Sequence, residues 1–209
     1  MRTWRIGILG AVAAVVGWAG IAQASANIDL LWNGTSDAIS GVSTSSNLTL
    51  HVILTAGPKG SMGAGVSIDY SDAIGKVEMI GFSSTGADSI FPIVLGSTYD
   101  TGSAVRNVNG ACLPGAGLGS CLGAGESYLL GTLTFHKIDG AGSFEVIPLT
   151  IMGPPDGTDA ILDLDGNDIS STSTLNVAYF VNPEPGTASL LMAGLVGIAA
   201  ARRRAVARS

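Results

Sequence analysis

The feature that most constrains the fold of this 209-residue chain is a strict alternation of apolar and polar residues in short runs. Runs at 48–54, 66–70 and 129–136 place apolar side chains at every second position, the period of a strand with one buried face. Clusters of Gly, Ser, Asn and Asp separate these runs. Between residues 27 and 182, no stretch keeps a 3.6-residue period over three turns without Gly or Pro. The pattern predicts β-strands and argues against alternating strand and helix units.

Nine strands are expected between the two ends of the chain. Short strands with turn signals between them are typical of a sandwich or jelly roll. The 30 glycines and 8 prolines argue against a helical bundle. We therefore predict a single antiparallel β-sandwich over residues 27–181. The nine expected strands cover residues 28–32, 48–54, 66–70, 77–82, 90–95, 129–135, 143–149, 160–164 and 175–181.

Charge is scarce in this chain and unevenly placed. Charged residues make up 12% of the sequence, about half the usual 25%. Six of the ten cationic residues lie at the two ends, so residues 27–182 hold four cations against fifteen acids, a net charge of −11. Such a body has no basic stripe to neutralise phosphates, so nucleic acid is not an expected partner. Divalent cations remain possible partners of this acidic body.

The N-terminus has the pattern of a secretory signal peptide. Residues 1–5 are cationic, 6–22 form an uncharged apolar run, and alanines follow at positions 22, 24 and 26. The run is shorter than the ~20 residues that a spanning helix prefers, and it ends in A-x-A-like sites. The alternative is an uncleaved membrane anchor. We expect residues 1–26 to direct export through the general secretory translocon, with signal peptidase cutting after Ala24 or Ala26.

The C-terminus holds three elements in a fixed order. Pro183-Glu184-Pro185 comes first, the apolar stretch 187–201 follows, and Arg202, Arg203 and Arg204 come last. Fifteen helical residues cover about 22 Å of a hydrocarbon core of roughly 30 Å, which predicts a short transmembrane helix. The arginines stay cytoplasmic by the positive-inside rule, so Pro-Glu-Pro lies on the outer face as an extended, accessible peptide.

Residues 182–209 resemble the PEP-CTERM sorting signal. The resemblance rests on Pro183-Glu184-Pro185 as the sorting motif, the apolar helix, and the triple arginine as the cytoplasmic stop. It implies a sortase-like route in which an exosortase processes the protein at the inner membrane and the body passes to the cell surface or extracellular matrix. Members of this family are associated with exopolysaccharide and biofilm. A plain tail anchor is the alternative.

Two segments of the body resemble the cohesin-like and carbohydrate-binding group of β-sandwiches. The first is Leu48–Leu54 followed by Gly63–Tyr70, which is similar to that group's strand, loop and strand. The second is Leu130–Phe135 followed by Gly142–Phe144, which is similar to its late hairpin. The resemblance implies a fold and no binding residues.

Cys112 and Cys121 are the only cysteines, and they flank a flexible eight-residue loop in a chain expected to leave the cytoplasm. A disulfide is therefore predicted. A catalytic thiol, the alternative, needs a nearby histidine. His51 and His136 both fall on the polar phase of predicted strands, which is typical of surface histidines. They form a metal site only if their strands are adjacent with a carboxylate between them.

An acidic segment offers oxygen ligands. Asp163, Asp165 and Asn167 copy the start of a calcium loop, with Asp168 as a further candidate ligand. The segment then departs from the EF-hand pattern, because Asp168 stands in place of the sixth-position glycine and Thr174 in place of the twelfth-position glutamate. An irregular Ca²⁺ site is one interpretation, and a solvated turn between two strands is the other. A pair of these acids could also serve a glycosidase, although nothing in the sequence marks such a pair.

Trp32 is the only tryptophan after the predicted signal peptide. It is a candidate for stacking on sugar rings, together with Tyr70, Tyr99 or Tyr179, or else a core residue. No catalytic motif is present. We therefore expect a non-catalytic surface or matrix protein with no resident cofactor. A carbohydrate-binding module and a secreted glycan hydrolase are the alternatives.

Overall fold

The computed structural model describes residues 26–40, 46–95, 98–100, 103–138, 142–150 and 159–182. These ranges contain twelve strands and three short 3₁₀-helices. The strands are β1 (Ala26–Trp32), β2 (Ala38–Ser40), β3 (Asn47–Ala56), β4 (Gly63–Asp69), β5 (Val77–Ser84), β6 (Thr98–Asp100), β7 (Ala104–Ala111), β8 (Ser127–Lys137), β9 (Phe144–Leu149), β10 (Ile161–Leu162), β11 (Thr174–Asn176) and β12 (Ala178–Val181). The 3₁₀-helices cover Ser71–Ala73, Pro114–Ala116 and Ser170–Thr172.

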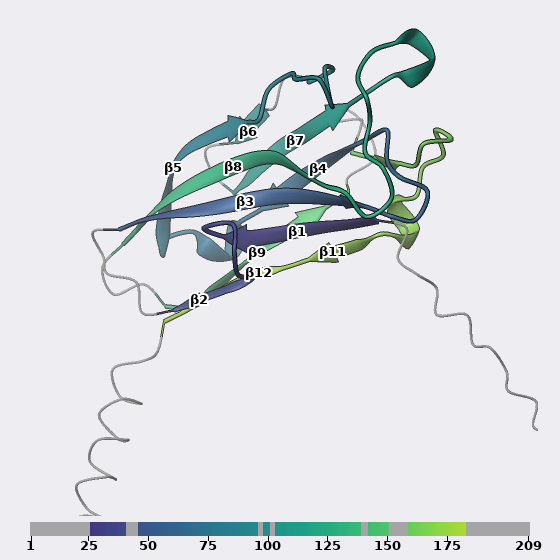
Figure 1. The fold of residues 1–209 in the computed structure, drawn as a ribbon. Coiled ribbons are helices and arrows are strands. Elements are labelled where there is room, and N and C mark those ends of the chain that lie inside the picture. The colour runs from purple at the N-terminus through teal and green to yellow at the C-terminus, as the bar shows by residue number, and fades with distance from the viewer. Residues whose placement is uncertain are drawn as a thin grey trace, which may run out of the picture.

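The strands form two sheets packed face to face (Figure 1). One sheet has the order β11-β1-β3-β8-β5. The other has the order β2-β12-β9-β4-β7-β6, with β10 beside β4. This confirms the predicted all-β sandwich. It is not wholly antiparallel, however, because β1 pairs in parallel with β11 and β2 pairs in parallel with β12.

The core lies between the two sheets and follows the period-two pattern of the sequence. Along β3 every second residue is buried, so Leu48, Leu50, Val52 and Leu54 face inward. Removing these side chains from water stabilises the fold by about 1.5–3 kcal/mol each. The centre of the core is aromatic. The rings of Phe135 and Phe144 each lie 6.1 Å from the Trp32 ring in edge-to-face geometry, and Phe180 stacks on Phe144 at 4.9 Å..

The observed strands differ from the predicted ones in four places. Residues 90–95 form no strand: Ile93 makes a single bridge to Ala111, and Pro92 beside it has no N–H to extend the ladder. The expected strand 175–181 is divided into β11 and β12, one in each sheet. Strand β7 was missed because its sequence, AVRNVNGA, has no clear alternation, and most of its residues are nonetheless buried. Strands β2 and β6 have three residues each, too few for a periodic signal.

Both predicted targeting segments fall largely outside the described residues. Strand β1 begins at Ala26, one residue inside the expected signal peptide, and the last described residue is Asn182. Pro183–Pro185, the apolar stretch 187–201 and Arg202–Arg204 are not among the described residues. Within the described ranges, no helix is long and apolar enough to cross a membrane.

Candidate functional site

Trp32 is a core residue, which corrects its assignment as a sugar-stacking candidate. It ends β1 and is 1% exposed, so its ring has no free face. Its indole Nε1 donates a hydrogen bond of 2.9 Å to the carbonyl of Tyr179 on β12. Because β1 and β12 belong to different sheets, this bond ties the two layers together. The sequence alone left both interpretations open, and the enclosure by Phe135 and Phe144 decides between them.

The tyrosines differ from one another in exposure. Tyr70 is 5% exposed and packs edge-to-face on Phe135 at 5.6 Å. Tyr179 is 46% exposed. The side chain of Tyr99 lies outside the described part of the structure. Of the tyrosines weighed as stacking residues, Tyr179 is therefore the one that the structure places at the surface.

The predicted disulfide is present. Cys112 and Cys121 are bonded, with their Cα atoms 5.5 Å apart. They close the loop that follows β7 and protrudes from the sandwich (Figure 1). Leu113 and Leu118 pair across this loop through reciprocal backbone hydrogen bonds of 2.7 and 3.1 Å. Neither sulfur is a free thiol, so the catalytic-thiol alternative is excluded for this oxidised form.

The two histidines lie on adjacent strands of the five-stranded sheet but far apart along them. His136 on β8 is opposite Asn47, and His51 on β3 is opposite Thr132. This four-residue offset corresponds to about 13 Å along the strands. The ring of His136 bonds the side chain of Asn47 at 3.2 Å. The geometry does not bring the histidines together as a metal pair.

The acidic segment 163–168 forms a turn held by its own hydrogen bonds. Asp163 Oδ1 accepts the backbone N–H groups of Asp165 and Asn167 at 3.0 and 2.9 Å. Both Asp163 oxygens also accept from the Asn167 amide at 3.2 and 3.1 Å. These bonds, with the side-chain bond from Asn167 as the largest cause, hold the pKa of Asp163 below its usual range. The Asp163 carboxylate thus organises the turn.

The predicted Ca²⁺ ligands also have other partners. Lys59 Nζ lies 3.0 Å from Asp165 Oδ2 and 3.6 Å from Asp163 Oδ2. A hydrogen bond to Asp165 is the largest cause that raises the pKa of Lys59. Asp168 accepts instead from the N–H and hydroxyl of Ser170. In the part of the chain that the structure describes, no three His, Cys, Asp or Glu residues are arranged to hold a metal. The geometry supports the turn interpretation.

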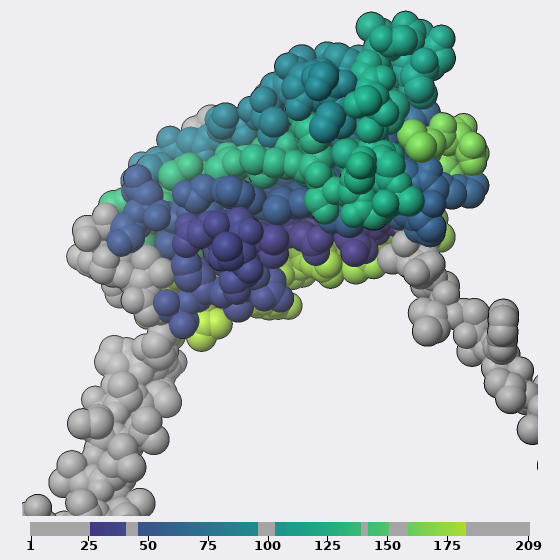
Figure 2. All heavy atoms as spheres, viewed as in Figure 1, coloured from purple at the N-terminus to yellow at the C-terminus, as the bar shows by residue number. Residues whose placement is uncertain are grey.

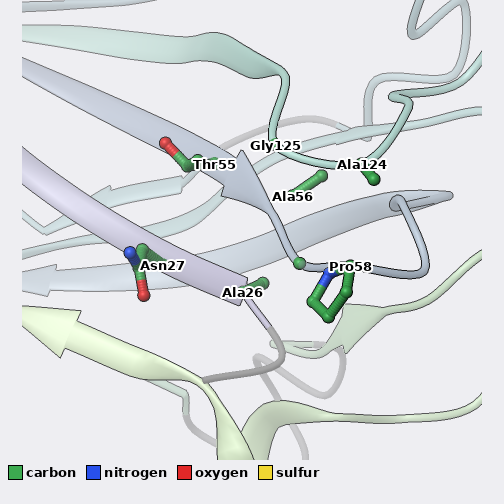
Figure 3. Close-up of a pocket in the computed structure, with 8 residues that line it drawn as sticks. Ala26, Asn27, Thr55, Ala56, Pro58, Ala124 and Gly125 are labelled. Atoms are coloured by element: carbon green, nitrogen blue, oxygen red, sulfur yellow. The ribbon is translucent and has the colours of Figure 1, made fainter. Parts of the chain in front are cut away.

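An open cavity of about 450 Å³ lies where β1 begins (Figure 3). Thr55 and Asn27 bring polar side chains to it, and Thr55 bonds the hydroxyl of Ser127 at 2.8 Å. The remaining lining residues are small or backbone-rich, and none of them is titratable. Among the described residues, the lining of this cavity therefore holds no acid or base for catalysis. It is lined by Ala26, Asn27, Thr55, Ala56, Gly57, Pro58, Ala124 and Gly125.

Solved structures of cohesin modules have a similar fold. The type III cohesin of the ScaE cell-surface anchoring scaffoldin of Ruminococcus flavefaciens matches with a TM-score of 0.52 and 10% identity, covering 77% of this chain and 89% of that one. The third ScaC cohesin of Acetivibrio cellulolyticus, solved with the ScaB dockerin, matches with a TM-score of 0.49 and 10% identity, covering 76% of this chain and 99% of that one. A cohesin module of a Clostridium perfringens family 33 glycoside hydrolase matches with a TM-score of 0.45 and 12% identity, covering 77% of this chain and 99% of that one.

At these identities the likeness concerns the fold, and it confirms the cohesin-like sandwich predicted from the sequence. No family model matches the chain, and no curated protein sequence matches it.

Proposed function

We propose that this protein is an exported surface or matrix protein that an exosortase processes at the inner membrane. The observation that carries the proposal is the order of three elements at the C-terminus: Pro183-Glu184-Pro185, the apolar stretch 187–201, and Arg202-Arg203-Arg204. The arginines hold the end in the cytoplasm, and the prolines keep the motif extended on the outer face. Glu184 is part of a substrate for processing and not a catalyst.

The disulfide supports an extracytoplasmic location for the body. Cys112 and Cys121 are bonded, and structural disulfides persist in oxidising compartments while cytosolic thiols are kept reduced. The N-terminal pattern of residues 1–26 provides the route of export.

The sandwich acts as a non-catalytic module that works by binding. Both cysteines are oxidised, the two histidines are apart, and the acids of the 163–168 turn are engaged in local hydrogen bonds. A cohesin module of a cell-surface anchoring scaffoldin has the same general fold. That similarity supports a β-sandwich that is displayed at the cell surface and works by binding. The exopolysaccharide of the matrix is the proposed partner.

The proposal is tested in the native host and in a strain lacking its exosortase, by fractionating cells and following the protein. We expect release from the membrane only when exosortase is present. Glu184→Ala should keep the protein in the membrane of the wild-type strain. Thr187→Ala, just beyond the motif, should leave release unchanged. Retention of residues 202–209 in the membrane of both strains would instead indicate a tail-anchored protein and refute sorting.

A further inference from the structure

A second hollow, of about 640 Å³, lies along one edge of the sandwich. The chain passes from one sheet to the other twice at this edge, between β1 and β2 and between β11 and β12. Figure 1 shows these four strands along the same edge. In Figure 2 the purple and blue atoms of β1 and β2 lie beside the yellow-green atoms of β11 and β12. We call this hollow the edge groove. Its lining residues used below are Asp29, Asp37, Asn176 and Tyr179.

Tyr179 lines the edge groove, and its backbone is held on a rigid support. Its backbone N–H donates to the carbonyl of Asp37 at 2.7 Å, and its carbonyl accepts from the buried indole of Trp32 at 2.9 Å. The side chain is 46% exposed. A tyrosine whose backbone is held in this way loses little conformational entropy when a ligand packs on its ring.

Two carboxylates supply hydrogen-bond acceptors. Asp29 Oδ1 accepts from the Asn176 amide at 2.6 Å, which orients the carboxylate and leaves its second oxygen for another donor. Asp37 is exposed and has no side-chain hydrogen bond within the described residues. Ionised carboxylates form strong hydrogen bonds with hydroxyl donors. The lining of the groove therefore includes one exposed tyrosine and two carboxylates, whose oxygens are suited to accept from hydroxyl groups.

A sugar ring has the matching chemistry. Its C–H face packs on the electron-rich face of an aromatic ring, and its hydroxyls donate to carboxylates. The volume lies within the range of about 300–1,000 Å³ usual for small-ligand sites. None of the described residues that line the groove is a cation, and residues 27–182 carry a net charge of −11. Uronate, sulfated or phosphorylated sugars would be repelled, whereas neutral and amino sugars would not.

A peptide is the less favourable occupant. Adding a strand needs a long free edge with unpaired backbone groups. The edge strands of the two sheets here, β11 and β2, have three residues each. Strand β12 is already paired on both sides.

We propose that the edge groove binds a neutral or amino-sugar segment of a polysaccharide, with Tyr179 stacking on a ring and Asp29 and Asp37 accepting hydroxyl hydrogens. This inference rests on the proposed function in one respect, since surface display is what brings the groove to matrix glycans. The binding chemistry itself is measured on purified protein and is independent of sorting.

The test is calorimetric titration of the mature protein, purified from its host, with three oligosaccharides: cellohexaose, chitosan hexamer and an alginate hexamer. We expect saturable binding of cellohexaose or chitosan hexamer and none of alginate. Tyr179→Ala should weaken binding about ten- to a hundredfold, on the scale of the loss when an aromatic residue that stacks on a nucleic-acid base is removed. Tyr179→Phe should bind like wild type.

Val181→Ala is the matched control. Val181 lies two residues along β12, is also 46% exposed, and does not line the edge groove. It should leave the affinity unchanged. Asp37→Asn should reduce any preference for the amino sugar.

Three results would overturn the inference. They are binding of neither cellohexaose nor chitosan hexamer, wild-type affinity in Tyr179→Ala, and tighter binding of the alginate hexamer than of the other two oligosaccharides. The first would favour a peptide as occupant. If the protein is sorted as proposed but binds neither sugar, the groove assignment fails alone. If it binds but is not released by exosortase, the sorting proposal fails alone.

Discussion

Removing the disulfide gives a quantitative test of the protruding loop. In the chain-entropy model, closing a loop with the sequence separation of nine seen here stabilises the fold by about 2.7 kcal/mol at 25 °C. Both cysteines are buried, at 1% and 6% exposure, so alanine is the suitable replacement because serine would bury an extra hydroxyl. With a urea m-value of about 2 kcal/mol/M, Cys112→Ala/Cys121→Ala should lower the unfolding midpoint by about 1.3 M.

The assay is urea unfolding followed by the fluorescence of Trp32, which is fully enclosed in the core and the only tryptophan after residue 26. Wild-type protein with its disulfide reduced serves as the control and should show the same shift. A loss of less than about 0.3 M in both samples would refute the reasoning that the loop is held by its covalent closure.

Cys121 adds a second, finer test, because its φ of 56° is left-handed. Alanine in that conformation costs roughly 1–2 kcal/mol, which glycine avoids. Glycine also raises the conformational entropy of the unfolded chain, which lowers the free energy of unfolding by about 0.4–1 kcal/mol and offsets part of that gain. Cys112→Ala/Cys121→Gly should therefore be more stable than the double-alanine variant by up to about 1.6 kcal/mol. Equal or lower stability of the glycine variant would show that the loop relaxes once the disulfide is gone.

Three further predictions concern stability and processing. Gly63→Ala should destabilise the fold by about 1–3 kcal/mol or more, because the new Cβ would lie 2.3 Å from the Gly110 carbonyl oxygen, at a backbone φ of 148°. Gly81→Ala is the control, since its new Cβ meets nothing within 4 Å. Similar urea midpoints for the two variants would contradict this prediction. The folded pKa values of Asp88 and Asp163 are lowered, chiefly by hydrogen bonds that the Phe91 N–H donates to Asp88 and the Asn167 side chain donates to Asp163. Their stabilisation is therefore present above the unfolded pKa of about 4 and is lost as pH falls through the folded values. Thermal melts between pH 6 and 2.5 should show a smaller loss in Asp163→Asn than in wild type, and parallel curves would count against the assignment. Ala26 is 2% exposed and pairs with Ala56, so signal peptidase should cut after Ala24, and N-terminal sequencing that begins at residue 27 would be inconsistent with Ala26 belonging to β1.

The sequence predicted the fold where one face of a strand is buried and the other is not. Strand β3 has this character along its length, and its alternation is plain. Strand β4 is buried on nearly every residue, and it was found because apolar positions at 66, 68 and 70 still alternate with polar ones. Strand β7 carries Arg106, Asn107 and Asn109, and its burial depends on neighbours that are distant in sequence, so local periodicity could not reveal it.

Among the candidate sites, too, the sequence predicted some features and left others undecided. Bonding of Cys112 to Cys121 was predictable because the two residues are close in sequence and the loop between them is flexible. The sequence analysis left Trp32 open, although Trp32 ends β1 on the same inward phase as Ile28 and Leu30. That alternation is the signal that could have placed its ring in the core. The edge groove joins residues near 30 with residues near 177. The parallel pairings of β1 with β11 and of β2 with β12 bring them together, whereas the sequence pattern predicted antiparallel pairing.

The measurement that tests the central proposal most directly is the intact mass of the protein recovered from outside the host cells. We expect a chain that begins after Ala24, ends between Pro183 and Pro185, and is two hydrogen atoms lighter than its fully reduced form. One mass thus reports export, sorting and the disulfide together. A mass that includes Arg202–Ser209, or finding the protein only in the membrane fraction, would contradict it.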